Sequence, residues 1–163
     1  MAYDELTATA VEVDRLGAAG MTMPPPLAAL YRLWSEKRGA RRAPARGDFD
    51  IFELRPWLGF LTLIDVIDGG RDFFYRVSGT NVTEFYGNDL TNRRLSEVEP
   101  GIRAVVEPEY RRVIADARPL FVVRRPRVRR ESARVARCLL PLSSDGRTID
   151  QIFIGFHELG EEA

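Results

Sequence analysis

Two side chains suited to chemistry occur once each in this chain, the histidine His157 and the cysteine Cys138. Imidazole and thiolate are the groups that proteins most often use as bases, nucleophiles and soft metal ligands. One cysteine excludes an internal disulfide, and one of each excludes a Cys/His zinc site built from this chain alone. His157 ends a predicted strand, where a half-exposed structural role is favoured over catalysis. Cys138 lies inside another predicted strand and is expected to be a small core residue.

Sequence motifs for enzyme catalysis are also missing. The chain contains no G-x-S-x-G nucleophile turn, no G-x-x-x-x-G-K-[ST] phosphate loop and no G-x-G-x-x-G turn. Its 163 residues leave no room for an ATP-binding kinase domain beside another domain. These absences predict a protein that is not an enzyme and has no metal site, and they leave its cofactor unknown.

Composition indicates one folded domain. The chain is 45% hydrophobic and 29% charged, with 24 basic and 24 acidic residues. No apolar stretch approaches the ~18 residues of a membrane-spanning helix, and the acidic N-terminal region does not resemble a secretory signal. We therefore expect a cytoplasmic protein without membrane insertion.

Lys37 is the only lysine, so every other basic side chain counted here is an arginine. Many of these arginines lie in one segment, Arg124–Arg137. Strand alternation would place Arg125, Arg127 and Arg129 on one face. The basic strip is defined here as Arg125, Arg127, Arg129 and Arg134. A solvated hairpin protected from edge pairing is the favoured interpretation. An acidic protein partner comes next, ahead of nucleic acid, because no aromatic side chains for base stacking are interleaved.

The pattern of elements predicts an α+β fold. An amphipathic helix over 27–38 precedes strands at 58–66 and 73–78, short helical turns, a helix near 102–114, and strands at 120–128, 134–142 and 149–157. Hairpin connections favour a five-stranded antiparallel sheet with helices packed on one face. The expected organisation is a flexible arm and Pro-rich spacer at 1–26, a flanking helix and Arg-rich loop at 27–47, the domain at 48–158 and a polar tail at 159–163. Translation from Met21 or Met23 is an alternative start.

Local stretches in this order resemble short bacterial proteins of the PAS domain family. The resemblance covers about residues 27–157 and depends on the order of several short motifs rather than on any one of them. These motifs are Tyr31-x-x-Trp34, Pro44-Ala45-Arg46, Asp48-Phe49-Asp50, Glu53-Leu54-Arg55-Pro56-Trp57-Leu58, Phe74-Tyr75-Arg76-Val77-Ser78-Gly79-Thr80, Tyr86-Gly87-Asn88-Asp89-Leu90-Thr91 and Leu139-Leu140-Pro141-Leu142-Ser143-x-Asp145-Gly146.

The resemblance implies a sensory or signalling module with a cavity between sheet and helices. Light-oxygen-voltage members carry a reactive cysteine in the helical patch, and the similar region here, 87–95, has none. Covalent flavin switching is therefore excluded, whereas non-covalent binding stays open. Candidate cavity residues, for which core packing is the plainer interpretation, are Tyr75, Val77, Tyr86, Val106, Tyr110, Ile152 and Ile154.

The sequence thus predicts a non-enzymatic sensory module that acts through a protein partner in a signalling pathway. A small apolar or mixed-polarity ligand would occupy the cavity, and the tyrosines are favoured contacts because a buried phenol needs a partner. The helix at 27–38 would either cover the open face of the sheet or pair with a second copy in a homodimer. The alternative function is a phosphate- or nucleic-acid-binding regulator that uses the Arg124–Arg137 segment.

Overall fold

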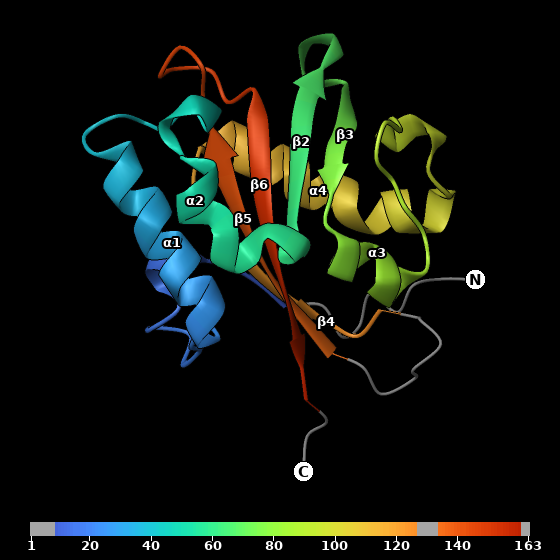
Figure 1. Ribbon diagram of the computed structural model, residues 1–163, viewed down its shortest axis with the longest axis horizontal. Coiled ribbons are helices and arrows are strands. Elements are labelled where there is room, and N and C mark those ends of the chain that lie inside the picture. The colour runs from blue at the N-terminus through green and yellow to red at the C-terminus, as the bar shows by residue number, and fades with distance from the viewer. Residues whose placement is uncertain (1–8, 127–133, 161–163) are drawn as a thin grey trace.

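A six-stranded antiparallel sheet forms the centre of the computed structural model, which describes residues 9–126 and 134–160 (Figure 1). The strand order is β1-β4-β5-β6-β2-β3. The strands are β1 (Thr9–Glu12), β2 (Leu61–Ile67), β3 (Asp72–Ser78), β4 (Leu120–Arg124), β5 (Arg134–Leu142) and β6 (Gln151–Leu159). The α+β class and the antiparallel sheet expected from the sequence are confirmed.

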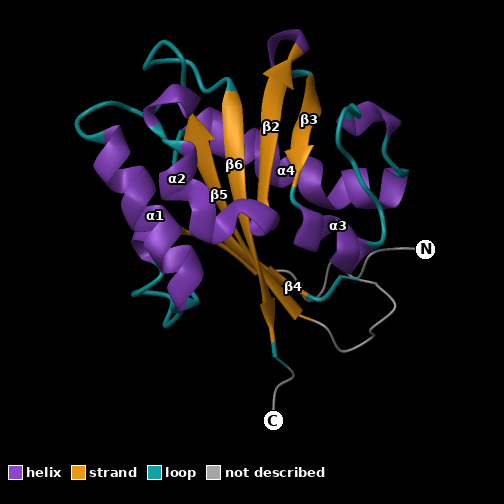
Figure 2. Ribbon diagram, in the orientation of Figure 1, coloured by secondary structure: helices purple, strands orange, loops and turns teal. Residues whose placement is uncertain are grey.

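The helices connect these strands in the expected order (Figure 2). They are α1 (Pro25–Arg38), α2 (Ile51–Leu54), α3 (Thr80–Tyr86) and α4 (Pro100–Asp116), and the 3-10 helix η4 (Arg55–Phe60) follows α2 directly. Within the described ranges, no helix is both long and apolar enough to cross a membrane.

The sheet has one more strand than the sequence predicted. Residues 9–12 fall in the expected flexible arm, yet they form β1 and pair with β4, with Thr9 opposite Val123 and Glu12 opposite Leu120. Four residues are too few for a reliable alternation pattern, so the pairing follows from the open edge of β4 rather than from local preference. Val11 also packs against the buried cluster on one face of the sheet.

Helices cover both faces of the sheet, because α1 covers the face opposite α4, which is one of the two roles expected for it. In Figure 1, α1 and the α2–η4 segment lie in front of the sheet and α4 lies behind it. The face under α1 is called the outer face here, and the face under α4 the inner face. Each face has its own buried apolar cluster, as expected when side chains alternate along every strand.

The apolar side of α1 is fully used against the outer face. Leu27, Leu30 and Trp34 are buried, and the Trp34 indole N–H donates to the carbonyl of Pro141 at 2.8 Å. Each such side chain contributes about 1.5–3 kcal/mol when removed from water. Of the two roles expected for this helix, the structure uses it to cover the sheet, which leaves these three side chains unavailable to a second copy.

On the inner face, α4 holds the other cluster in place. The Glu99 carboxylate caps the helix by accepting hydrogen bonds from the backbone N–H groups of Gly101 and Ile102. Val106, Tyr110 and Val113 then face the sheet, and the helix ends at Ala117 in the left-handed conformation. Pro108 lies inside the helix on its exposed side.

We predict that Gly79→Ala destabilises the protein, because Gly79 joins β3 to α3 where the backbone passes close to η4. Its N–H donates to the Leu61 carbonyl at 2.8 Å, and an added Cβ would lie 2.3 Å from the Gly59 carbonyl oxygen. Backbone atoms cannot move aside cheaply, so the free energy of unfolding should fall by about 1–3 kcal/mol. Urea denaturation measures this change.

Gly47→Ala is the matched control, because an added Cβ there meets nothing within 4 Å and the backbone has ordinary dihedrals. Its free energy of unfolding should change by less than about 1 kcal/mol. Equal unfolding midpoints for the two variants would contradict the close packing assigned to Gly79.

Candidate ligand-binding site

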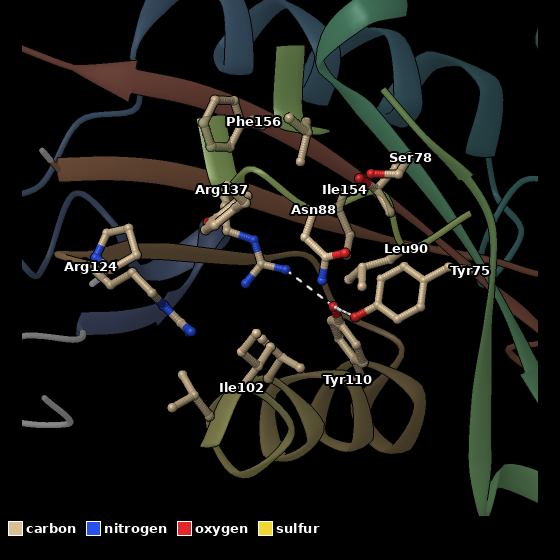
Figure 3. A pocket seen from close by; sticks show the side chains of 16 residues that line it. Tyr75, Ser78, Asn88, Leu90, Ile102, Tyr110, Arg124, Arg137, Ile154 and Phe156 are labelled. Carbon is tan, nitrogen blue, oxygen red and sulfur yellow. Dashed lines mark hydrogen bonds between the residues drawn. The ribbon is translucent and has the colours of Figure 1, made fainter. Parts of the chain in front are cut away.

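A cavity of about 120 Å³ lies between the inner face of the sheet and the helices α3 and α4 (Figure 3). Apolar side chains form most of its wall: Leu90, Ile102, Val105, Val106, Ile154 and Phe156. Asn88, an exposed residue in the segment that follows α3, also lines the cavity. The volume is close to that of engineered apolar cavities of ~150 Å³ that bind benzene, so the space suits a body of about one ring.

Of the seven candidate cavity residues, five line this wall: Tyr75, Tyr86, Val106, Tyr110 and Ile154. Ile152 is fully buried in the inner cluster but is not part of the wall. Val77 is 48% exposed and lies outside the cavity altogether.

A β-bulge explains the position of Val77. Leu63 pairs with Val77 and the next residue, Ile64, pairs with Tyr75, so Arg76 is an extra residue in β3. The extra residue breaks the alternation of side chains, and Arg76 and Val77 are both exposed. Ser78 then reaches the cavity in the place that regular alternation would give to Val77.

Two buried arginines give the cavity its polar end. Arg124 is the last residue of β4 and Arg137 lies near the start of β5. Arg124 follows Leu120 and Val122 on the inner face, and Arg137 lies opposite Val122 and two residues before inward-facing Leu139. Alternation therefore directs both guanidinium groups inward, and Figure 3 shows them extending into the cavity.

Glu109 on α4 holds both guanidinium groups through one carboxylate. Arg137 Nη1 donates to Glu109 Oε2 at 3.0 Å, and Arg124 Nη2 forms an ion pair with Glu109 Oε1. The three side chains are 8–10% exposed. Charges so poorly hydrated must be paired, so this cluster ties α4 to β4 and β5.

Two tyrosines extend the polar end along the cavity wall. Arg137 Nη2 donates to the Tyr110 hydroxyl at 3.3 Å, and the hydroxyls of Tyr110 and Tyr75 lie 2.9 Å apart (Figure 3). Burial raises the pKa of the Tyr75 phenol well above its ordinary value, and the hydrogen-bonded Tyr110 raises it further. Tyr75 therefore stays protonated across the physiological range.

The Arg137 guanidinium also keeps its proton and its positive charge. Burial by itself lowers the pKa of its guanidinium, but the neighbouring hydroxyls of Tyr110, Tyr86 and Tyr75 raise it, and the net direction is upward. The polar end of the cavity therefore presents the Arg137 cation beside the neutral Tyr75 phenol.

The basic strip is divided by the structure. Arg125 is exposed and Arg134 is half-buried, whereas Arg127 and Arg129 lie outside the described residues. The two arginines at the ends of the wider segment, Arg124 and Arg137, are the ones that face the cavity. Neither of them, nor Glu109, is among the site residues predicted from the sequence, although the alternation of the two arginines with Leu120, Val122 and Leu139 is a usable signal.

His157 and Cys138 lie away from the cavity. His157 is half-buried near the end of β6 and pairs with Ala136. Cys138 is buried in the outer cluster, where burial raises the pKa of its thiol to about 12. It is a core residue without thiolate character, as its place inside a predicted strand indicated. In the described parts of the chain, no three His, Cys, Asp or Glu side chains gather as metal ligands would.

The fold belongs to a known protein family. A family model described as a PAS domain matches residues 22–156, and the chain belongs to that family. PAS domains are sensory and signalling modules, as the sequence resemblance implied. The search of curated proteins gave no significant match.

One solved structure is similar, described as the structure of an RNA-binding light-oxygen-voltage receptor. The likeness has a TM-score of 0.48 with 15% sequence identity, and it covers 93% of this chain and 38% of the receptor chain. This chain therefore spans less than two fifths of the receptor's length.

The Glu109 cluster leads to a prediction about stability. Glu109→Gln removes the only charge that joins the two guanidinium groups among the described residues, and breaking a buried pair in this way costs about 3–5 kcal/mol. Guanidinium-induced unfolding followed by far-UV circular dichroism measures the loss.

Glu107→Gln is the matched control on the same helix. Glu107 pairs with Arg111 one turn away, but its side chain is 31% exposed, so the loss should be at most about 1 kcal/mol. If the two substitutions have the same effect, the buried cluster does not hold α4 to the sheet.

Proposed function

We propose that this PAS domain is a non-enzymatic sensor that binds a small ligand in the cavity and signals through contact with a protein. The observation that carries this proposal is the cavity itself, which combines apolar walls with an ordered polar end. A protein core fills its space with apolar side chains, whereas a binding site leaves room and places a few convergent polar groups around it. Arg137, Tyr110 and Tyr75 are such groups.

A route from the cavity to the surface supports the signalling role. Val82 and Tyr86 of α3 line the cavity, and α3 packs against η4 on its other side. Of the five exposed large apolar side chains among the described residues, the α2–η4 segment carries four: Ile51, Phe52, Leu58 and Phe60. A ligand that shifts α3 would therefore change a surface that suits contact with a protein.

The partner in this proposal is a protein, and a second copy of the chain is one candidate. Because the apolar side of α1 is already buried, a second copy would have to pair through the exposed side chains of the α2–η4 segment. The alternative function was binding of phosphate or nucleic acid by the Arg124–Arg137 segment. Both end arginines of that segment face the cavity, which supports ligand binding there instead. A cytoplasmic location, as expected from the sequence, is part of the same proposal.

Thermal unfolding with a panel of single-ring fragments tests the proposal. The panel contains neutral, cationic and anionic fragments, and Val105→Trp serves as a variant with a filled cavity. A fragment at ten times its Kd should raise the Tm of the wild-type protein by roughly 3–5 °C. The filled variant should show no such rise. Hydrogen exchange should slow in α3 and η4 of the wild-type protein when that fragment is bound.

The proposal fails if no fragment of any charge stabilises the wild-type protein more than Val105→Trp. It also fails if a fragment binds in the cavity but leaves hydrogen exchange in α3 and η4 unchanged, because the signal would then have no route to the surface.

A further inference from the structure

The charged side chains at the polar end of the cavity indicate the charge of its ligand. Among the described residues on the wall, Arg124 and Arg137 are cationic and none is acidic. The carboxylate of Glu109 lies behind the wall and is shared between both guanidinium groups. In a poorly hydrated space, the attraction of such cations for an anion is several times stronger than in water.

Arg137 has donors available for a ligand. A guanidinium group has five N–H donors, and the contacts with Glu109 and Tyr110 engage two of them. Its side chain is 9% exposed, and in Figure 3 the group lies inside the cavity rather than at the rim. The remaining N–H groups can form the paired hydrogen bonds that a carboxylate accepts.

The tyrosine pair adds one more donor in either arrangement of its hydrogens. If Tyr75 donates to Tyr110, the Tyr110 hydroxyl keeps its own hydrogen for a ligand. If Tyr110 donates to Tyr75, the Tyr75 hydroxyl keeps its hydrogen instead. Because the raised pKa of Tyr75 keeps that phenol protonated, the pair contributes a neutral donor beside the Arg137 cation.

The rest of the wall determines the polarity and size of the part of the ligand that carries no charge. Ile102, Val106 and Ile154 provide apolar surface on the same wall, and a volume of about 120 Å³ admits roughly one ring or a short branched chain. An inorganic anion would leave this apolar surface without a partner.

We propose that the cavity binds a small carboxylate with an apolar body, whose carboxylate accepts hydrogen bonds from Arg137 and from the Tyr75–Tyr110 pair. This assignment rests on the proposed sensory function and adds the chemical class of the ligand. A single carboxylate matches the one tyrosine donor and the Arg137 fork better than a dianionic phosphate, which requires more donors and loses more hydration on burial.

Isothermal titration calorimetry with benzoate tests the proposal, with benzyl alcohol, benzylamine and phenyl phosphate as comparison ligands. Wild-type protein should bind benzoate at least about tenfold more tightly than benzyl alcohol, since hydrogen bonds to charged groups are worth more than neutral ones. Benzylamine should bind more weakly still, because its cation meets the arginines. Phenyl phosphate should bind less tightly than benzoate.

Arg137→Met is the decisive variant. It leaves Arg124 paired with Glu109, so no uncompensated buried charge is created and the variant is expected to fold. Benzoate should lose its tenfold advantage over benzyl alcohol, whereas benzyl alcohol should bind nearly as in the wild-type protein. Arg76→Met is the control, because Arg76 pairs with Asp65 and is not part of the cavity wall. It should keep full discrimination.

If Arg137→Met does not fold, the double variant Tyr75→Phe/Tyr110→Phe provides the second test: it removes the donor of the tyrosine pair, and benzoate affinity should fall several-fold. Equal affinity for benzoate and benzyl alcohol in the wild-type protein overturns the proposal, as does unchanged benzoate binding by Arg137→Met or tighter binding of phenyl phosphate. In those cases a bound neutral fragment or phosphate still leaves the proposed sensory function standing. Absence of binding by every ligand would remove both.

Discussion

The sharing of one buried carboxylate between two arginines is the interaction on which the rest of the structure depends. Glu109 must lie between Arg124 and Arg137, and this requirement sets the position of α4 along the inner face of the sheet. Burying charges is expensive, and a cluster of this kind adds less stability than an apolar core of the same volume. Its presence beside a cavity therefore agrees with the proposed role of the cavity in ligand binding.

The outer face of the sheet is closely packed under α1, whereas the inner face contains the cavity. On the outer face, α1 covers the strands with fully buried side chains, and Gly155 of β6 lets Leu27 and Leu30 approach the backbone closely. On the inner face, the same strands meet α4 and α3 with a cavity between them. Because β5 and β6 contribute to both faces, the packing under α1 supports the strands that position Arg137 and Ile154.

Much of this architecture follows from the sequence. Short motifs in a characteristic order indicated the PAS fold, and the spacing of Leu27, Leu30 and Trp34 predicted an amphipathic helix that the structure contains. The tyrosines of the cavity were selected by a simple physical argument, namely that a buried phenol needs a hydrogen-bond partner. The structure places Tyr75 and Tyr110 against each other and against Arg137.

Other features depend on tertiary contacts, and the sequence pattern predicts them poorly. β1 is short and is stabilised by the edge of β4, which no local pattern reports. Val77 lies outside the cavity because of a one-residue bulge, and a bulge depends on the pairing between strands. Arg124 and Arg137 belong to a segment rich in like charges, for which a solvated surface is the usual interpretation. Their burial requires Glu109, which comes from another element.

A crystal structure of the protein soaked with benzoate tests the central claim most directly, because it shows which end of the ligand meets the arginines. The account predicts the carboxylate within hydrogen-bond distance of Arg137 and one of the hydroxyls of Tyr75 and Tyr110, with the ring against Ile102, Val106 and Ile154. Benzoate bound with its ring against Arg137 and its carboxylate away from both tyrosine hydroxyls would contradict the account. So would a cavity without benzoate at saturating concentration.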